Sequence, residues 1–256
     1  MFDLMQESVL NFNQGHKNIL KCMKNPVQSH LPKINLHTHQ IVIGEQIQVL
    51  NVFAQDLPMN ENKQYFSTGL HPWHIGKVNP ETCFQAIELA AKQKNMLAIG
   101  ECGLDRSIAT EFSLQLSHFK KHIEIAEKYN KPLIIHCVRA FSDLIQLKKE
   151  TKSSIPWLIH GYNGNMDTTK NLVRHGFYLS AGEKFLSSES KHTVLQTIPN
   201  DRIFLETDDR EISIEDVYLL ASQILKIEEN TLIKMIFNNF KTIFGDDKLA
   251  LNNYLT

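Results

Sequence analysis

The segment Ile34-Asn35-Leu36-His37-Thr38-His39-Gln40 carries two histidines separated by one residue. Side chains alternate between the two faces of a β-strand, so an extended chain places His37 and His39 on one face and Leu36 and Thr38 on the other. Two imidazoles that face one point could bind a single metal ion. They could equally be hydrogen-bonded histidines at a strand end, and the rest of the chain must decide between these interpretations.

Downstream of this segment, short apolar runs alternate with longer amphipathic stretches, which is typical of parallel strands joined by crossover helices. The chain has 256 residues, of which 42% are hydrophobic, and a barrel of eight β/α units needs about 250 residues. We therefore expect an α/β fold of the (β/α)8, or TIM, barrel class. The predicted strands are 34–37, 47–54, 65–70, 96–101, 132–137, 157–161, 177–181 and 203–207.

The later connections between these strands are predicted to be helical, whereas the first three strands are joined by connections too short for a full helix. Asn79-Pro80 is typical of a helix start, and Gly176 of the residue just past a helix end. Residues 1–33 are expected to form an N-terminal helical extension, and residues 34–256 one barrel domain. The predicted helices are 80–94, 111–130, 141–149, 166–174, 187–197, 214–226 and 229–244.

The charge balance limits the kinds of partner. Lys plus Arg number 27 against 28 for Asp plus Glu, so the chain lacks the positive field that would hold a long duplex by many phosphates. The four cysteines show no disulfide framework, and we find neither a signal peptide nor a membrane-spanning run. We expect a cytoplasmic monomer whose contacts with any nucleic acid are short and local.

Potential metal ligands follow the predicted strands at their carboxyl ends, which meet at one mouth of a (β/α)8 barrel. Each alone could be an ordinary rim residue, but burying so many unpaired imidazoles and carboxylates would cost several kcal/mol per charge. Nitrogen and oxygen donors without thiolate favour Zn, Mn, Mg, Ni or Co. The residues are His37, His39, His71, Glu101, His136, His160 and Asp208.

The number of donors exceeds what one tetrahedral ion can use, so we expect two divalent ions. His37, His39 and Asp208 would surround one ion. His136 and His160 would bind the other, with Glu101 as the bridge between them.

Six blocks of sequence occur in a fixed order along the chain: His37-Thr38-His39, Gly69-Leu70-His71-Pro72, Ala98-Ile99-Gly100-Glu101-Cys102-Gly103-Leu104-Asp105, Ile134-Ile135-His136-Cys137, His160-Gly161-Tyr162-Asn163-Gly164 and Leu205-Glu206-Thr207-Asp208. Together they resemble the TatD family of metal-dependent hydrolases, which belongs to the amidohydrolase-like TIM barrels. The resemblance runs from about Ile34 to Gly245 and is more specific than any single motif.

The resemblance implies a two-metal phosphodiesterase that acts on DNA, often as a nuclease that trims single strands from the 3′ end, with metal-bound hydroxide as the nucleophile. Asp208, which would also orient the attacking water, and the bridging Glu101 are the expected catalytic residues. His71 would face the substrate. The implied metal ligands are His37, His39, Glu101, His136, His160 and Asp208.

Further residues near this mouth are predicted to contact substrate. Trp73 and Tyr162 fall in rim loops, where an aromatic ring could stack on a base at about 1–3 kcal/mol. Arg139, and with it Arg106, could bind a phosphate. A surface ion pair explains either arginine equally well.

Three features depart from the family pattern. The segment 40–68 is short, and Arg139 lies three residues after His136, where the family places an arginine two residues on. Asp209-Arg210-Glu211 replaces the usual turn after the last strand. The ligand set is intact, whereas the parts that would select a substrate are altered.

Two other functions stay open at this point. A lactonase or amidase could use the same ion pair to polarise a carbonyl, and the net charge of −1 mildly favours such a small-molecule substrate. A binding protein that retains a metal without turnover is permitted by the short loops, although the complete ligand set argues against it. The expected partner is therefore short or single-stranded DNA, or a small phosphoester or ester.

Overall fold

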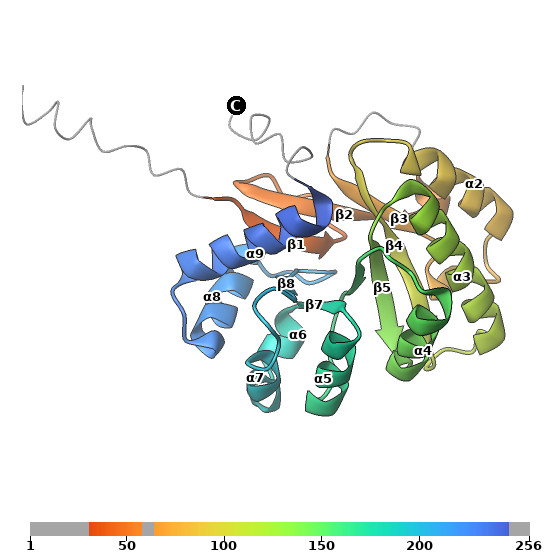
Figure 1. Cartoon of the computed structure of the whole chain (residues 1–256). Helices are drawn as coiled ribbons and strands as arrows, with labels where there is room; N and C mark the ends of the chain where they lie inside the picture. The colour runs from red at the N-terminus through yellow and green to blue at the C-terminus, as the bar shows by residue number, and fades with distance from the viewer. Residues whose placement is uncertain (1–30, 58–63, 246–256) are drawn as a thin grey trace, which may run out of the picture. The chain divides into compact units, whose positions relative to one another are not determined.

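The computed structural model describes residues 31–57 and 64–245, and within them it contains one sheet of eight parallel strands in chain order (Figure 1). This is the (β/α)8 barrel predicted from the sequence. The strands are β1 (Lys33–Thr38), β2 (Gln46–Phe53), β3 (Phe66–Gly69), β4 (Met96–Asp105), β5 (Leu133–Val138), β6 (Trp157–Ile159), β7 (Phe177–Ala181) and β8 (Ile203–Leu205).

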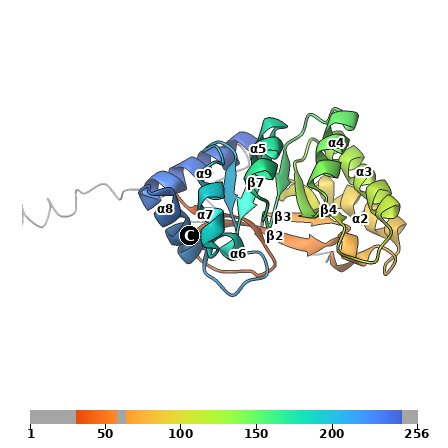
Figure 2. The same cartoon turned by 90° about the horizontal axis from the view of Figure 1, so that it is seen from below.

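Helices lie outside the strands, as the two views in Figures 1 and 2 show. Asn79 caps the first of them by accepting a hydrogen bond from the Thr82 amide at 3.2 Å, as its position before Pro80 predicted. The helices are α2 (Pro80–Ala91), α3 (Phe112–Tyr129), α4 (Phe141–Thr151), α5 (Met166–Arg174), α6 (Glu183–Leu186), α7 (Glu189–Leu195), α8 (Ile214–Leu225) and α9 (Glu229–Phe244).

One predicted helix is wrong in its extent. The helix predicted over 187–197 forms as the shorter α7, and it is preceded by α6, a short helix that the sequence did not predict. Ser187 and Ser188 separate them, because serine favours helix ends over helix interiors. Helix α6 begins directly after β7, at the mouth of the barrel.

The shortened first crossovers are confirmed for the part of the chain that the structure describes. Residues 39–45 join β1 to β2 without a helix, and only a short 3-10 turn, Ala54–Asp56, lies between β2 and β3 in the described ranges. The predicted extension of residues 1–33 falls outside the described residues except at its end, so the division into extension and barrel stays a prediction.

The barrel closes between its first and last strands at their carboxyl ends. Thr38 and Asp208 form a parallel bridge, in which the Asp208 amide donates to the His37 carbonyl at 3.0 Å and the His39 amide donates to the Asp208 carbonyl at 3.2 Å. The side chain of Asn35 adds two hydrogen bonds to Thr207, at 2.9 and 3.1 Å. The strand segments that carry His37, His39 and Asp208 therefore hold one another in place.

A tyrosine from α8 supplies the hydrogen-bond partner of the Ile34 backbone amide and carbonyl at the start of β1. The Tyr218 hydroxyl accepts from the Ile34 amide at 3.0 Å and donates to the Ile34 carbonyl at 3.1 Å, and both residues are fully buried. An unsatisfied buried backbone group costs about 1–3 kcal/mol.

We expect Tyr218→Phe to lower the free energy of unfolding by about 1–3 kcal/mol, measured by urea denaturation, because both Ile34 groups lose their partner. Tyr178→Phe is the matched control, since no hydrogen bond of the Tyr178 hydroxyl occurs within the described ranges. Equal unfolding midpoints for the two variants would show that the Tyr218 hydroxyl contributes nothing.

None of the helices within residues 31–57 and 64–245 has both the length and the apolar character to cross a bilayer.

Candidate metal centre

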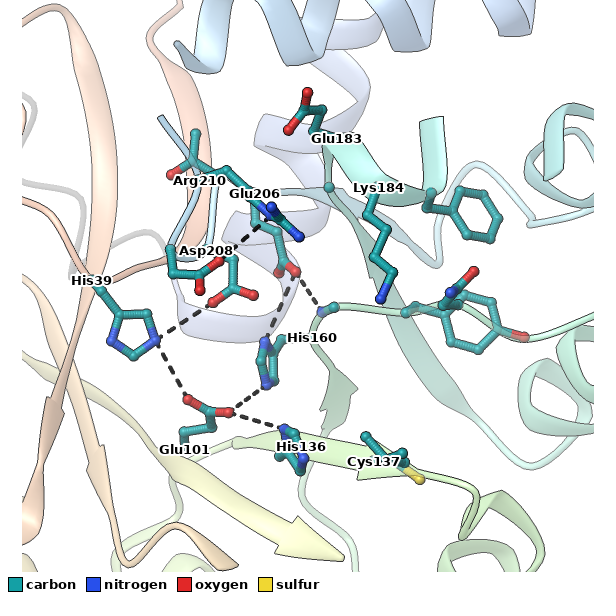
Figure 3. A pocket seen from close by; sticks show the side chains of 18 of the residues that line it. His39, Glu101, His136, Cys137, His160, Glu183, Lys184, Glu206, Asp208 and Arg210 are labelled. Carbon is teal, nitrogen blue, oxygen red and sulfur yellow. Dashed lines mark hydrogen bonds and ion pairs between the residues drawn. The ribbon is translucent and has the colours of Figure 1, made fainter. Parts of the chain in front are cut away.

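The six predicted ligands come together at the carboxyl ends of the strands, although they lie far apart in the sequence. Figure 3 shows all of them except His37. His37 belongs to β1, Glu101 to β4 and His136 to β5. His39 and His160 directly follow the ends of β1 and β6, and Asp208 lies three residues after the end of β8. Nitrogen and oxygen atoms of His37, His39 and Asp208 lie within 4.8 Å of one another, as do those of His37, Glu101 and His160.

Glu101 lies at the centre, and its two carboxylate oxygens face different histidines. Oε2 is 3.5 Å from Nε2 of His37 and 3.6 Å from Nε2 of His39. Oε1 is 3.2 Å from Nδ1 of His136 and 2.7 Å from Nε2 of His160. Asn51 fixes this orientation, since its side chain accepts from the Glu101 amide at 2.9 Å and donates to Oε2 at 3.4 Å.

The first donor group has the spacing of ligands around one ion. Oδ1 of Asp208 is 3.4 Å from Nε2 of His37 and 3.5 Å from Nε2 of His39. Two donors that bind one ion at about 2.1 Å lie about 3.0–3.4 Å apart for bond angles of about 90–110°. The side chains therefore fit a divalent cation with little movement.

The buried histidines lack the hydrogen bonds that such groups normally make. His37 and His160 are 0% and 6% exposed. Among the described residues, neither ring nitrogen of either side chain has a hydrogen-bond partner of acceptable geometry. Leaving a buried polar atom unsatisfied costs about 1–3 kcal/mol. A cation that binds these lone pairs would remove that cost, so the residues present fit a metal centre.

Opposite charges shift the pKa values of these groups apart. Burial alone would lower the pKa of His39 and of His136, yet the neighbouring carboxylates outweigh burial and raise each to about 9. The carboxylates responsible are Asp208 and Glu101 for His39, and Asp105 and Glu101 for His136. Burial would raise the pKa of Glu101, but the surrounding histidines lower it well below its usual value. Protons on the imidazoles thus neutralise the carboxylates, as a bound cation would.

His71 contacts Glu101 but has the hydrogen bonds of a positioning residue. Its Nδ1 accepts from the Trp73 amide at 3.1 Å, so in the neutral ring Nε2 carries the proton and donates to Oε1 of Glu101, 2.9 Å away. Burial lowers the pKa of His71 to about 4, which keeps the ring neutral. His71 therefore supports the Glu101 carboxylate, although its distances alone would also allow it to bind a metal.

Asp105 orients His136 and was not among the site residues predicted from the sequence. Its Oδ2 accepts from Nε2 of His136 at 3.0 Å and from the Trp73 indole at 2.9 Å, while Oδ1 accepts from the Ser107 amide at 2.8 Å. This directs Nδ1 of His136 at Glu101. Strand alternation could have identified Asp105, because it lies on the same face of β4 as Glu101.

We expect Asp105→Asn to weaken metal binding by about 10–100-fold, because the amide can present its NH2 to His136 and favour the wrong tautomer. Equilibrium dialysis with Zn or Mn measures the affinity directly. Asp167→Asn, an exposed first-turn residue of α5, is the control. A native affinity in Asp105→Asn would mean that the contact with His136 has no orienting role.

Glu206 is a second buried carboxylate that the sequence did not single out. Its Oε1 accepts a hydrogen bond from the Gly161 amide and lies 3.9 Å from Nδ1 of His160. Burial raises the pKa of Glu206 to about 8. Its place two residues before Asp208 was the available signal, and its contacts show that it helps to position the segment after β6.

A cavity of about 560 Å3 opens above the ligand cluster. His71, Trp73 and Tyr162, which the sequence predicted to contact substrate, line this cavity. Trp73 is 51% exposed, whereas Tyr162 is buried and its hydroxyl lies 2.7 Å from the hydroxyl of Thr169. Arg139 is exposed and is not among the lining residues.

Arg106 is also absent from the cavity lining. Its guanidinium donates to Asp143 at 3.0 and 2.7 Å and lies 3.7 Å from the centre of the Phe112 ring. The surface ion pair is therefore the correct interpretation of Arg106.

Comparisons with known proteins agree with this arrangement. An uncharacterized metal-dependent hydrolase, BU355, from Buchnera aphidicola subsp. Acyrthosiphon pisum is 27% identical, over 92% of this chain and 95% of its own length. A TATDN1 homologue from Enterocytozoon bieneusi, provisionally named a deoxyribonuclease, is 26% identical over 86% of this chain and 88% of its own.

Solved structures share the fold. A TatD family hydrolase from Entamoeba histolytica superposes with a TM-score of 0.69 at 18% identity, over 85% of this chain and all of that one. The TatD homologue YJJV from Escherichia coli gives 0.68 at 19% identity, over 77% of this chain and 85% of its own. The family model of TatD related DNases matches residues 35–245. This chain thus belongs to the TatD family and is a metal-dependent hydrolase.

Proposed function

We propose that the protein is a two-metal phosphodiesterase that cleaves DNA. The observation that supports this most directly is the position of Glu101, whose Oε2 faces His37 and His39 while its Oε1 faces His136 and His160. A carboxylate that presents one oxygen to each of two donor groups is suited to bridge two ions.

The proposal keeps the division expected from the sequence, with His37, His39 and Asp208 around one ion and His136 and His160 around the other. Divalent ions bound there would lower the pKa of water and polarise the phosphoryl group. Asp208 is the candidate to orient the attacking water and to accept its proton, since it is the carboxylate of the group that lies partly open to the cavity. Glu101 and His71 would hold the cluster rigid as charge develops.

The choice of DNA has support from the cavity and from the relatives. A volume of about 560 Å3 lies in the range of small-molecule sites, so it suits a nucleotide at a strand end better than a duplex. The half-exposed Trp73 at the rim offers a ring on which a base could stack. The name of the Enterocytozoon relative points to the same substrate.

The test is an assay of the purified protein with Mn, Mg, Zn or Co against three substrates: 3′-labelled single-stranded DNA, bis-p-nitrophenyl phosphate and a lactone panel. We expect phosphodiester turnover that disappears with EDTA and in both His136→Ala and Asp208→Ala. Lactone turnover alone would replace the phosphodiesterase by a lactonase. Metal binding without any turnover would leave a binding protein.

A further inference from the structure

We propose that Lys184 binds a phosphate group next to the scissile phosphodiester, and so selects substrates that carry a second phosphate. The inference rests on the proposed phosphodiesterase function. It starts from the finding that neither arginine considered in the sequence for phosphate binding reaches the cavity.

Two basic side chains with permanent charge line the cavity within the described residues, Lys184 and Arg210. Arg210 is 3.7 Å from Asp209 and is exposed. Lys184 has no carboxylate within 4.0 Å among the described residues, although Glu206 and Asp208 line the same cavity. Its charge is therefore available to an anion, and it lies beside the ligand cluster without contacting it.

The position of Lys184 is set by a well-packed segment. Its neighbours Phe185 and Leu186 are 2% and 1% exposed, and the Phe185 ring lies 5.9 Å from that of Tyr162. In Figure 3 the Lys184 side chain extends into the pocket while that of Glu183 points the other way. The buried side chains of Phe185 and Leu186 thus hold the backbone in place, while the flexible side chain of Lys184 extends into the cavity.

The electrostatics of the cavity also favour a second anionic site. Glu101 and Asp208, the carboxylates of the ligand cluster, line the same cavity and face its histidines. The proposed ions would be needed to neutralise these carboxylates and the scissile phosphate. Lys184 has no such neighbour, so a further phosphate would form its charge-assisted hydrogen bond.

Three thymidine dinucleotides separate this role from a general effect on catalysis. TpT has only the scissile phosphodiester, pTpT adds a 5′ phosphate and TpTp adds a 3′ phosphate. With the Mn-loaded protein we expect kcat/KM for pTpT or for TpTp to exceed that for TpT. The compound with the higher value shows whether Lys184 binds the 5′ or the 3′ phosphate.

Lys184→Ala should then lower kcat/KM for the preferred phosphorylated dinucleotide about 10-fold or more, and it should leave kcat/KM for TpT unchanged. The loss on the phosphorylated dinucleotide should be smaller at high salt, because salt screens the charge of Lys184. Lys184→Arg should restore most of the preference, and Lys170→Ala on the exposed side of α5 should retain it. Equal losses on all three dinucleotides, or a preference that disappears in Arg139→Ala instead, would overturn the proposal.

If the loaded native protein hydrolyses none of the dinucleotides, the proposed function fails, and calorimetric titration with the same compounds decides on Lys184. Tighter binding of pTpT or TpTp than of TpT, lost in Lys184→Ala, would support the phosphate site. Equal binding of the three compounds would overturn it.

Discussion

Replacing Glu101 by glutamine is expected to lower the rate of phosphodiester hydrolysis by about a thousandfold or more, which corresponds to about 4 kcal/mol in the barrier. The amide has nearly the same size and can still contact Asn51. It has no charge and only one oxygen, so it cannot serve both His37 and His39 on one side and His136 and His160 on the other. Metal content, measured by mass spectrometry, should fall with the rate.

Glu183→Gln is the matched control for this change. Glu183 also lines the cavity, but its side chain points away from the ligand cluster (Figure 3). We expect this variant to keep native metal content and rate. A Glu101→Gln protein that retains two ions and hydrolyses at a near-native rate would contradict the bridging role.

Metal uptake by the metal-free protein is expected to release at least about two protons at pH 7. The carboxylates raise the pKa of His39 and of His136 to about 9, and Asp208 and Glu101 also raise that of His37 against the effect of burial. These rings must lose their protons before their nitrogens can bind an ion. The apparent affinity should therefore rise with pH up to about 9.

Isothermal titration in buffers of different ionisation enthalpy counts the released protons. His39→Gln should release fewer protons than the native protein, because one protonated ring is gone. His175→Gln, at the exposed end of α5, should release the native number. Proton release that is independent of His39 would show that this ring is neutral before the metal binds.

The sequence was a good guide to the fold because strands buried on both faces are continuous apolar runs. It was a poorer guide where a glycine could either end a strand or allow two strands to pack closely. The strand predicted to end at Glu101 continues to Asp105, and Gly103 within it is a position of close approach, where a Cβ would clash with the His136 carbonyl oxygen. This glycine lets β4 and β5 pack closely and does not end the strand.

For the candidate site, the sequence predicted the residues at the strand ends, since the barrel brings those ends together whatever the loops do. It could not predict side chains placed by loop geometry. Arg139 has a left-handed backbone conformation, with φ of 54°, and its side chain does not line the cavity. Lys184 lines the cavity from α6, a short helix at the mouth that the sequence did not predict.

The junction between β1 and β8 has a consequence for the protein during its synthesis. Asn35 and Thr207, which help to form it, are 172 residues apart in sequence. In chain order the paired histidines and Glu101 therefore precede Asp208 by a large part of the barrel. The proposed donor set can be completed only after β8 and the segment that follows it have been synthesised.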